Sequence, residues 1–193
     1  MSADDPQRAI LPEERLAAHH RDLAGAARLR RWLLVWLILF WALTIQMIVP
    51  PAPRLVWNAS ASAPVGLYRV RPGAAPGRGD MVVAWMPGAF RHLAATRRYV
   101  PENVPLVKRV SGIAGDRICA GGMAVTVNGR RVAIRRARDG QHRPMPWWHG
   151  CRTLRAGEFF LLMKDAAASF DGRYFGITAR ADIIGKATLL WSR

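Results

Sequence analysis

The sequence is poor in cysteine, lysine and acidic side chains. Its 193 residues contain two cysteines, three lysines and 13 acidic residues, against 29 basic residues in total. Two cysteines are too few for a disulfide-scaffold protein and form no zinc-finger spacing, and no tight repeat indicates a solenoid. The formal charge of +16 indicates an anionic partner or surface, either nucleic acid or anionic lipid, and a hydrophobic content of 51% supports a folded core.

Two common hydrolase signatures are also missing. The chain has no G-x-S-x-G nucleophile elbow and no H-E-x-x-H zinc motif, so it lacks the marks of α/β-hydrolases and of zinc proteases. Its five histidines are scattered, and nothing groups one of them with a serine and an aspartate. We therefore expect neither a metal site nor a cofactor.

A long uncharged run, Trp32–Val49, is the most prominent local feature. As a helix, its 18 residues cover about 27 Å, close to the bilayer's hydrocarbon thickness of about 30 Å. Trp32 lies where an interfacial ring is expected, and Pro50, Pro51 and Pro53 end the helix. The run predicts one transmembrane helix in the lipid bilayer.

Two alternatives to an uncleaved anchor remain open. A cleaved signal peptide would have a short charged region before its apolar core, whereas 31 residues precede this run. The stretch Ala59–Ala61 resembles a cleavage site, although it lies ten residues past the run. The second alternative is a buried helix of a soluble protein, for which 18 apolar residues are long.

The charges beside the run predict its orientation. Arg28, Arg30 and Arg31 crowd its N-terminal side, and only Arg54 lies just beyond its other end. The positive-inside rule therefore places the N-terminus in the cytoplasm and residues 50–193 on the outer side.

The chain thus divides into a cytoplasmic segment, residues 1–31, a transmembrane helix, residues 32–49, and an exported domain, residues 50–193. The first segment has a net charge of +1 and the exported domain one of +15. Because the basic excess lies outside, away from the chromosome, we expect no nucleic-acid partner.

The exported domain has the texture of a mainly β fold. Short apolar segments alternate with glycine-rich turns, which is typical of strands joined by hairpins. Asn128-Gly129 between two such segments predicts a type I′ hairpin turn. The predicted strands are residues 67–70, 81–85, 106–110, 124–127, 131–134, 158–163 and 187–191.

Cys119 and Cys151 both fall in the exported domain, where oxidising conditions permit a disulfide. Closing a loop of about 30 residues stabilises a protein by roughly 3–4 kcal/mol in the chain-entropy model. Two buried free thiols are the alternative, and the compartment favours the disulfide.

Lysine is scarce enough for its positions to be informative. Lys108 lies in the valine-rich segment Leu106–Val110, where strand alternation turns it inward. Arginine stays protonated, whereas a buried lysine can lose its proton near neutral pH and act as a base. A solvated strand lysine is the ordinary alternative.

Three stretches, read together, resemble sequence boxes of the type I signal peptidases. Residues 58–68, NASASAPVGLY, are similar to the S-x-P-x-G-x-Y box that follows the anchor in this family. Residues 106–116, LVKRVSGIAGD, resemble the K-R-V-x-G-x-x-G-D lysine box. Residues 169–176, SFDGRYFG, together with IGKA at 184–187, resemble the C-terminal S-x-D-S-R-Y-x-G…G-R-A box. The three boxes stand in order behind an anchor, which makes the resemblance specific.

Within this family the chain is similar to the TraF-type signal peptidases of conjugative transfer. One residue separates Ser62 from Pro64, where the housekeeping enzymes have two between serine and proline. The single anchor, the small size and the sequence Ser169-Phe170-Asp171 fit the same subgroup. Gly172 stands where serine is usual, and Lys164-Asp165-Ala166 stands where housekeeping enzymes have G-D-N. Neither departure removes a catalytic group.

The resemblance implies a domain of coiled antiparallel sheets that carries a Ser/Lys peptidase site. In that mechanism Ser62 is the nucleophile and Lys108 is the general base. The hydroxyl of Ser169 orients the Lys108 amine, and the Ser60 hydroxyl and the Ser62 N–H form the oxyanion hole.

The resemblance further implies that Asp171 and Arg173 form a structural ion pair under the site. It implies a single-pass protein of the bacterial inner membrane, with a periplasmic catalytic domain. The substrate would be a precursor with a signal peptide, a conjugative pilin, and the conjugation machinery would be a partner. Such a substrate adds as an extended strand, with small side chains at the first and third positions before the cut. Trp147 and Trp148 are assigned either to the bilayer interface or to the core.

Two other functional classes compete with this interpretation. A non-catalytic, membrane-anchored assembly protein of the envelope or of a conjugation system would share the anchor and the basic β domain. It would have no need of a neutral lysine. A self-cleaving Ser/Lys repressor would carry a DNA-binding helix pair and no anchor.

The topology can be tested by reporter fusions after residues 25 and 60. The positive-inside distribution predicts a cytoplasmic signal from the first fusion and an extracytoplasmic signal from the second. Alkaline phosphatase and a fluorescent protein that matures only in the cytoplasm supply the two readouts. The reverse pattern would refute the assignment, because the site would then face the cytoplasm.

Overall fold

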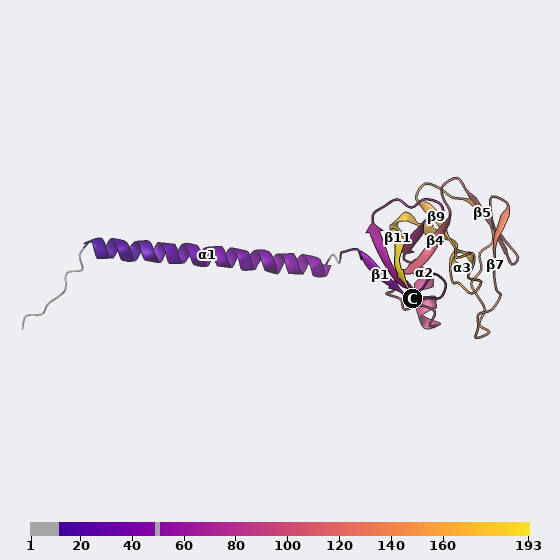
Figure 1. Cartoon of the computed structure of the whole chain (residues 1–193), viewed down its shortest axis with the longest axis horizontal. Helices are drawn as coiled ribbons and strands as arrows, with labels where there is room; N and C mark the ends of the chain where they lie inside the picture. The colour runs from indigo at the N-terminus through magenta and orange to yellow at the C-terminus, as the bar shows by residue number, and fades with distance from the viewer. Residues whose placement is uncertain (1–11, 49–50) are drawn as a thin grey trace, which may run out of the picture. The chain divides into compact units, whose positions relative to one another are not determined.

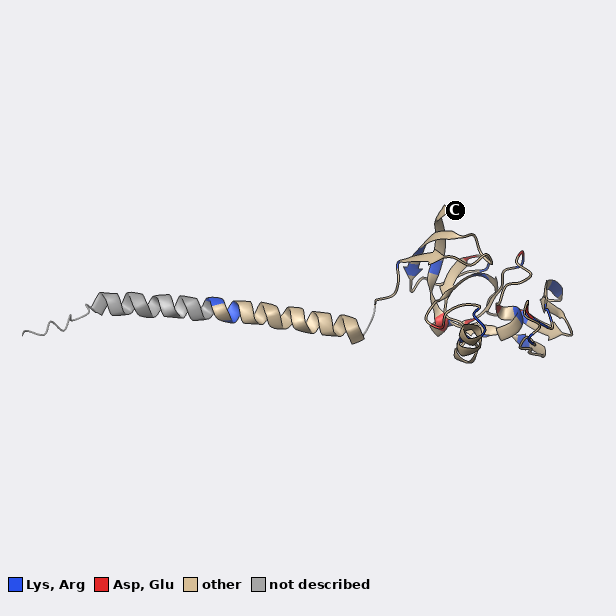
Figure 2. Cartoon of the chain, turned by 90° about the horizontal axis from the view of Figure 1, so that it is seen from below, with Lys and Arg blue, Asp and Glu red and all other residues tan. Residues whose placement is uncertain are grey.

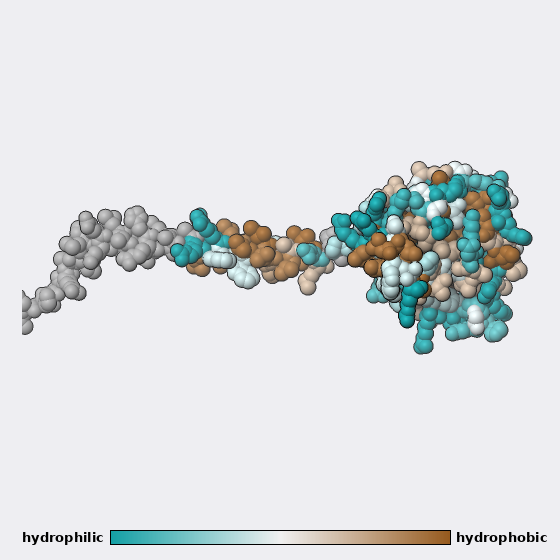
Figure 3. Space-filling view, in the orientation of Figure 1, coloured by the Kyte–Doolittle hydropathy of each residue, from teal (hydrophilic) through white to brown (hydrophobic). Residues whose placement is uncertain are grey.

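The computed structural model describes residues 12–48 and 51–193, which belong to two compact units, Met1–Pro51 and Ala52–Arg193. In the first unit, helix α1 spans Pro12–Ile48 (Figure 1). Its segment Arg28–Ile48 is long and apolar enough to cross a membrane, and none of it is buried in the structure (Figure 3). Val49, the expected last residue of the transmembrane helix, lies outside the described residues.

The second unit is mainly β, as the sequence predicts, and all its strands pair antiparallel in two sheets. The larger sheet has the order β1-β2-β11-β3-β4-β9-β10, and the smaller has the order β7-β6-β5-β8 (Figure 1). The strands are β1 Leu55–Asn58, β2 Gly66–Pro72, β3 Met81–Ala84, β4 Leu106–Gly112, β5 Arg117–Gly121, β6 Ala124–Val127, β7 Arg130–Ile134, β8 Gly150–Thr153, β9 Glu158–Leu161, β10 Ile177–Ala179 and β11 Ile183–Ser192. The helices are α2 Gly88–Thr96, α3 Gly172–Phe175 and a 3₁₀ turn, Arg180–Asp182.

The strands that alternate most clearly in sequence form where they are expected. At the predicted hairpin between β6 and β7, Asn128 and Gly129 have φ values of 50° and 78°. A type I′ turn requires positive φ at both central residues, and asparagine and glycine adopt it at low cost. The sequence reading missed β1, β5, β8, β10 and α2. β8, with the sequence GCRT, is exposed along its length and forms by pairing with β5 rather than through strand propensity of its own.

The core lies between and beneath the two sheets. Under the smaller sheet, Ile118 and Val125 pack against Phe160 of β9, so the two sheets share apolar contacts. Trp148 also packs against this cluster, and its indole N–H donates to the carbonyl of Gly172 at 3.1 Å. The structure therefore assigns Trp148 to the core rather than to a lipid interface. Basic side chains are spread over separate strands and loops of this unit (Figure 2).

Cys119 of β5 and Cys151 of β8 lie directly opposite each other and form a disulfide. The bond ties the exposed strand β8 to β5. Residues 135–149 join β7 to β8, so the disulfide also fixes one end of that connection. The structure therefore contains the disulfide and not the alternative of two free thiols.

Mass analysis of the membrane-extracted protein under non-reducing conditions tests this bond. We expect no alkylatable thiol, because the chain has no other cysteine to leave one free. A Cys119→Ala/Cys151→Ala variant should unfold at a lower temperature, by an amount corresponding to about 3 kcal/mol. Two alkylatable thiols in protein from oxidising conditions would contradict the prediction.

Candidate active site

The loop between β1 and β2 carries Ser60 and Ser62. Asn58, the buried last residue of β1, holds this loop through its side-chain amide. The amide N–H groups donate to the carbonyls of Ser60, Ala63 and Pro64 at 2.9, 3.1 and 3.0 Å. The amide oxygen accepts the Ser60 N–H at 3.1 Å. One buried side chain thus braces the turn at residues 60–63 and holds Ser62 in a fixed position.

Lys108 reaches this loop from the middle of β4. Its side chain is 3% exposed, whereas its neighbour Arg109 lies on the solvent side. The Lys108 Nζ is 2.8 Å from the Ser62 Oγ and 2.8 Å from the Ser169 Oγ. Three residues from three separate boxes therefore meet at one nitrogen atom.

Burial lowers the pKa of Lys108 from 10.5 to about 8. Desolvation is the largest cause, because the apolar surroundings disfavour the ammonium form. The nearby Asp171 carboxylate raises this pKa and the Arg173 guanidinium lowers it. These two charges oppose each other, so the desolvation effect dominates.

The loop that carries Ser169 is held by the Asp171–Arg173 ion pair. Both side chains are buried, and the Arg173 Nε is 2.8 Å from the Asp171 Oδ1. The same guanidinium donates to the carbonyls of Met163 and Ala167 at 2.7 and 3.2 Å. The two ends of the loop are thereby tied together, and Ser169 faces Lys108 on a constrained backbone.

The packing around α3 leaves room only for glycine at position 172. A Cβ atom at this position would lie 2.7 Å from the Leu161 carbonyl oxygen and 2.8 Å from the Phe160 ring. The first contact is with backbone of β9, which cannot move without shifting the strand. This crowding explains why the chain has glycine where serine is usual in the signal peptidase box.

Ser60 lies next to Ser62. Its Oγ is 2.9 Å from the Ser62 Oγ, and it accepts the Ser62 N–H at 3.3 Å. The two groups that the sequence assigns to an oxyanion hole are therefore neighbours, on the exposed side of the Ser62 hydroxyl.

Two cavities meet at Ser62 and Lys108. The larger, of about 630 Å³, lies among residues 60–62, 136–145 and 166–170, and the smaller, of about 240 Å³, lies between β1 and residues 99–108. The larger cavity has a size typical of ligand pockets. Among the described residues, no group of three or more His, Cys, Asp and Glu side chains could hold a metal ion.

The structure brings together all six residues that the sequence assigned to the site. Ser60, Ser62, Lys108 and Ser169 form one hydrogen-bonded chain, and the Asp171–Arg173 pair lies behind Ser169. Sequence reasoning missed the role of Asn58. Its position at the start of the Ser62 box was visible, but its contacts with three later carbonyls depend on the loop's conformation.

Comparison with known proteins identifies the family of the chain. The family model for signal peptidase, peptidase S26, matches residues 28–192, so nearly the whole described chain is covered. The chain belongs to the signal peptidase family, peptidase S26.

Three curated relatives and one solved structure give more detail. The chain is 34% identical to the "Probable conjugal transfer protein TraF" of Sinorhizobium fredii over 67% of this chain and 73% of that protein. It is 33% identical to the "Plasmid transfer protein TraF" of Escherichia coli, over 66% of this chain and 77% of that protein. It is 27% identical to the signal peptidase I of Leptolyngbya laminosa over 59% of this chain and 52% of that protein. A crystal structure of a signal peptidase I from Enterococcus faecalis aligns with a TM-score of 0.35 and 19% identity, covering 60% of this chain and 98% of that chain.

The cost of burying Lys108 can be measured as a pH-dependent stability. Its folded pKa lies below the unfolded value, so the unfolded chain binds more protons between about pH 8 and pH 10.5. The free energy of unfolding of the wild type should therefore rise with pH across that window. Relative to Lys108→Met, which has no charge to bury, the stability deficit should shrink by about 2–3 kcal/mol between pH 7 and pH 10.

Denaturant unfolding of the full chain in detergent, at several pH values, gives this difference. Lys164→Met is the matched control, because Lys164 is exposed and its loss should produce no pH-dependent gap. A gap between wild type and Lys108→Met that stays constant with pH would contradict a depressed Lys108 pKa.

Proposed function

We propose that this protein is a membrane-anchored serine endopeptidase that removes the signal peptide from an exported precursor, and that its precursor is a conjugative pilin. The observation that carries the proposal is the position of the Lys108 Nζ, buried and 2.8 Å from the Ser62 Oγ. Among the described residues, Lys108 has no ion-pair partner, so its burial lowers the stability of the fold. A lysine that acts as a general base has to be neutral, and burial without an ion-pair partner favours the neutral amine.

The proton moves along the short path between these two atoms. The neutral Lys108 amine accepts the Ser62 hydroxyl proton while the Ser62 Oγ attacks the scissile carbonyl carbon. One amine N–H donates to the Ser169 Oγ, which fixes the lone pair toward Ser62. The resulting ammonium protonates the leaving amine, and a water activated by the same lysine then hydrolyses the acyl-enzyme.

The negative charge on the carbonyl oxygen needs two donors. The Ser62 N–H and the Ser60 hydroxyl are adjacent in the free enzyme, where they bond to each other. A bound substrate carbonyl replaces this contact and accepts from both groups, which stabilises the oxyanion in the transition state. The mechanism requires neither a metal nor a cofactor.

The proposed location is the bacterial inner membrane, with the N-terminus in the cytoplasm and the catalytic unit in the periplasm. Helix α1 supplies one apolar segment for a single pass. Arg28, Arg30 and Arg31 at the start of this segment support the orientation. The β unit also exposes apolar side chains on β1 and β11, where the rings of Trp57 and Trp191 lie 5.7 Å apart. Part of the β unit's surface accordingly carries strongly apolar residues in Figure 3. Such a surface suits an enzyme that works beside a bilayer.

The proposed substrate follows from the relatives. Two of them are conjugal or plasmid transfer proteins named TraF, which supports a precursor of a conjugation system over a general secretory substrate. The proposed partners are therefore a pilin precursor with its signal peptide, the lipid bilayer and the conjugation machinery.

Exchange of Lys108 for arginine tests the dyad. Lys108→Arg keeps the positive charge and most of the length, yet a guanidinium stays protonated and cannot accept the Ser62 proton. We expect it to lose at least about 10³-fold in processing rate, and Ser62→Ala to lose as much. The double variant should be no slower, because the two residues act as one unit. The measurement is processing of a co-expressed pilin precursor at matched membrane abundance.

Three further variants complete this experiment. Ser169→Ala should lose less than either dyad variant, since Ser169 only orients the amine. Lys164→Arg and Lys186→Arg should stay near wild type, which separates the dyad from general effects of lysine replacement. Normal processing by Lys108→Arg would end the Ser/Lys mechanism and favour the non-catalytic assembly protein.

A further inference from the structure

The connection between β7 and β8, residues 135–149, forms one wall of the larger cavity. Arg136, Arg138, Asp139 and Met145 of this wall line the cavity together with Ser62 and Lys108. The wall connects two strands of the smaller sheet, whereas Lys108 lies on β4 of the larger sheet and Ser62 lies on the loop between β1 and β2. Whatever occupies the cavity therefore contacts both sheets.

Hydrogen bonds hold this wall in one conformation. The Asp139 carboxylate accepts from the hydroxyl of Tyr99, on the opposite rim, and from the Arg143 Nε at 2.7 Å. It also accepts the backbone N–H groups of Gln141 and Arg143, each at 2.9 Å. Arg97 reaches across to donate to the Pro144 carbonyl at 2.7 Å. The negative charge of Asp139 is thus paired with Arg143 of the same wall.

The base of the wall is fixed by a buried arginine. The Arg135 guanidinium lies 4.2 Å from the centre of the Trp147 ring and donates to the carbonyls of Trp148 and Gly122. The next residue, Arg136, donates its backbone N–H to the Tyr174 hydroxyl at 3.0 Å. Arg136 and Arg138 therefore project from a backbone that is already ordered.

The charges of Arg136 and Arg138 are not balanced in the structure. Neither forms an ion pair with a carboxylate of residues 28–48 or 51–193, and Arg138 donates only to the His142 carbonyl. By contrast, Arg143 is paired with Asp139, and Arg173 with Asp171. Asp139 is the only acidic residue lining the cavity in the described part of the chain, and Arg143 offsets its charge. With respect to the residues that the structure describes, the cavity beside Ser62 therefore carries two arginines without a counterion.

We propose that Arg136 and Arg138 form a subsite for a carboxylate of the substrate segment that lies in this cavity. The carboxylate comes from a Glu or Asp side chain or from the C-terminus of the segment. Arginine is suited to this role because its planar guanidinium binds carboxylate oxygens in pairs and stays charged at any working pH. The rigid wall lowers the entropy cost of that contact. The inference rests on the proposed function of Ser62 and Lys108.

Internally quenched peptides with an alanine before the scissile bond provide the test. Each of three positions on either side of that bond is occupied in turn by Glu, Gln or Lys, and each peptide is made with a free or an amidated C-terminus. For the full chain in detergent, Glu should exceed Gln at one position by about tenfold in kcat/KM, as expected for a charge-assisted contact. If the C-terminus supplies the carboxylate, the peptide with a free C-terminus should instead have a higher kcat/KM than the amidated peptide.

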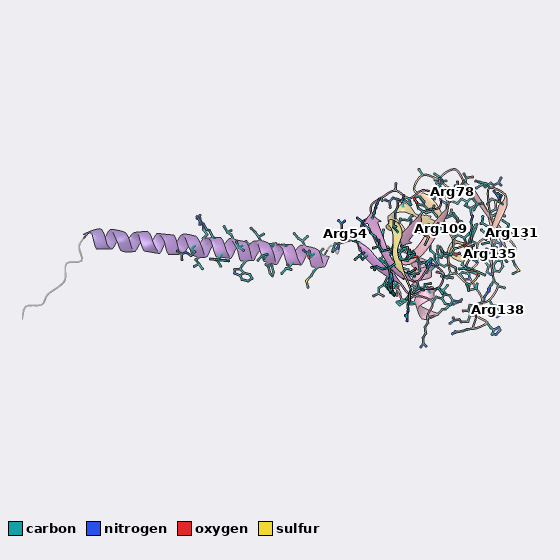
Figure 4. The ribbon with its side chains drawn as sticks, in the orientation of Figure 1. Arg54, Arg78, Arg109, Arg131, Arg135 and Arg138 are labelled. Carbon is teal, nitrogen blue, oxygen red and sulfur yellow. A yellow bond between two sulfur atoms is a disulfide. The ribbon has the colours of Figure 1, made fainter. Side chains whose placement is uncertain are left out.

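Exchange of the arginines identifies the subsite. In Arg136→Gln and Arg138→Gln, the ratio of kcat/KM for the carboxylate peptide to kcat/KM for the neutral peptide should fall toward one. In Arg138→Glu the preference should reverse, so that the Lys peptide is cleaved faster than the Glu peptide. Arg131→Gln is the matched control, because Arg131 is exposed on β7 and lies apart from Arg138 in Figure 4. That control should keep the wild-type ratio.

Binding of the same peptides to Ser62→Ala, followed by fluorescence anisotropy, separates this inference from the proposed function. Tighter binding of the carboxylate peptide, lost in the Arg136→Gln and Arg138→Gln backgrounds, supports the subsite even if the wild type cleaves no peptide. Cleavage with equal rates and equal affinities for carboxylate and amide peptides would overturn the subsite and leave the peptidase intact.

Discussion

The buried amine of Lys108 is the constraint on which the rest of the site depends. An ammonium group surrounded by apolar residues is costly, and the structure offers it hydroxyl groups rather than a carboxylate. This environment favours the neutral amine, which lowers the pKa of Lys108 to about 8. A carboxylate bonded to the amine at the same place would keep the lysine protonated. In the proposed mechanism, this loss of stability leaves a base that works near neutral pH.

The neighbouring buried ion pair illustrates the same balance. Asp171 and Arg173 satisfy each other and the carbonyl of Met163, so they brace the Ser169 loop with little net charge. Their effects on the pKa of Lys108 oppose each other. The pair can thus lie close to the dyad and stiffen it without returning the lysine to its charged form.

Electrostatics also distinguish the two sides of the cavity. Among the residues that the structure describes, the charged side chains that shift the pKa of Lys108 are paired, whereas Arg136 and Arg138 on the wall of residues 135–149 have no carboxylate partner. In the proposed subsite, these cations lie on a wall held by Asp139 and Arg135, and they select the substrate without taking part in proton transfer. On this proposal, catalysis depends on Lys108 of the larger sheet, and substrate selection depends on the connection between two strands of the smaller sheet.

Local patterns in the sequence determined much of this protein. An uncharged run of 18 residues suffices to predict an apolar helix, since helix length and hydropathy are local properties. The turn at Asn128-Gly129 is fixed by the positive φ values that these residues tolerate. Ser62, Lys108 and Ser169 could be selected because each lies in a box that resembles a known family.

Only the tertiary structure decided how these pieces meet. The contact between Ser62 and Lys108 joins residues 46 positions apart, and it depends on the register of β4 and on the amide of Asn58. Trp148 lies in the core because it packs against Phe160 of β9. Glycine is needed at position 172 because β9 leaves no room for a Cβ atom there. Arg136 and Arg138 look like ordinary surface charge in the sequence. Their significance comes from carboxylates that lie elsewhere or are already paired, and the pairing of charges across a fold is not written in local sequence.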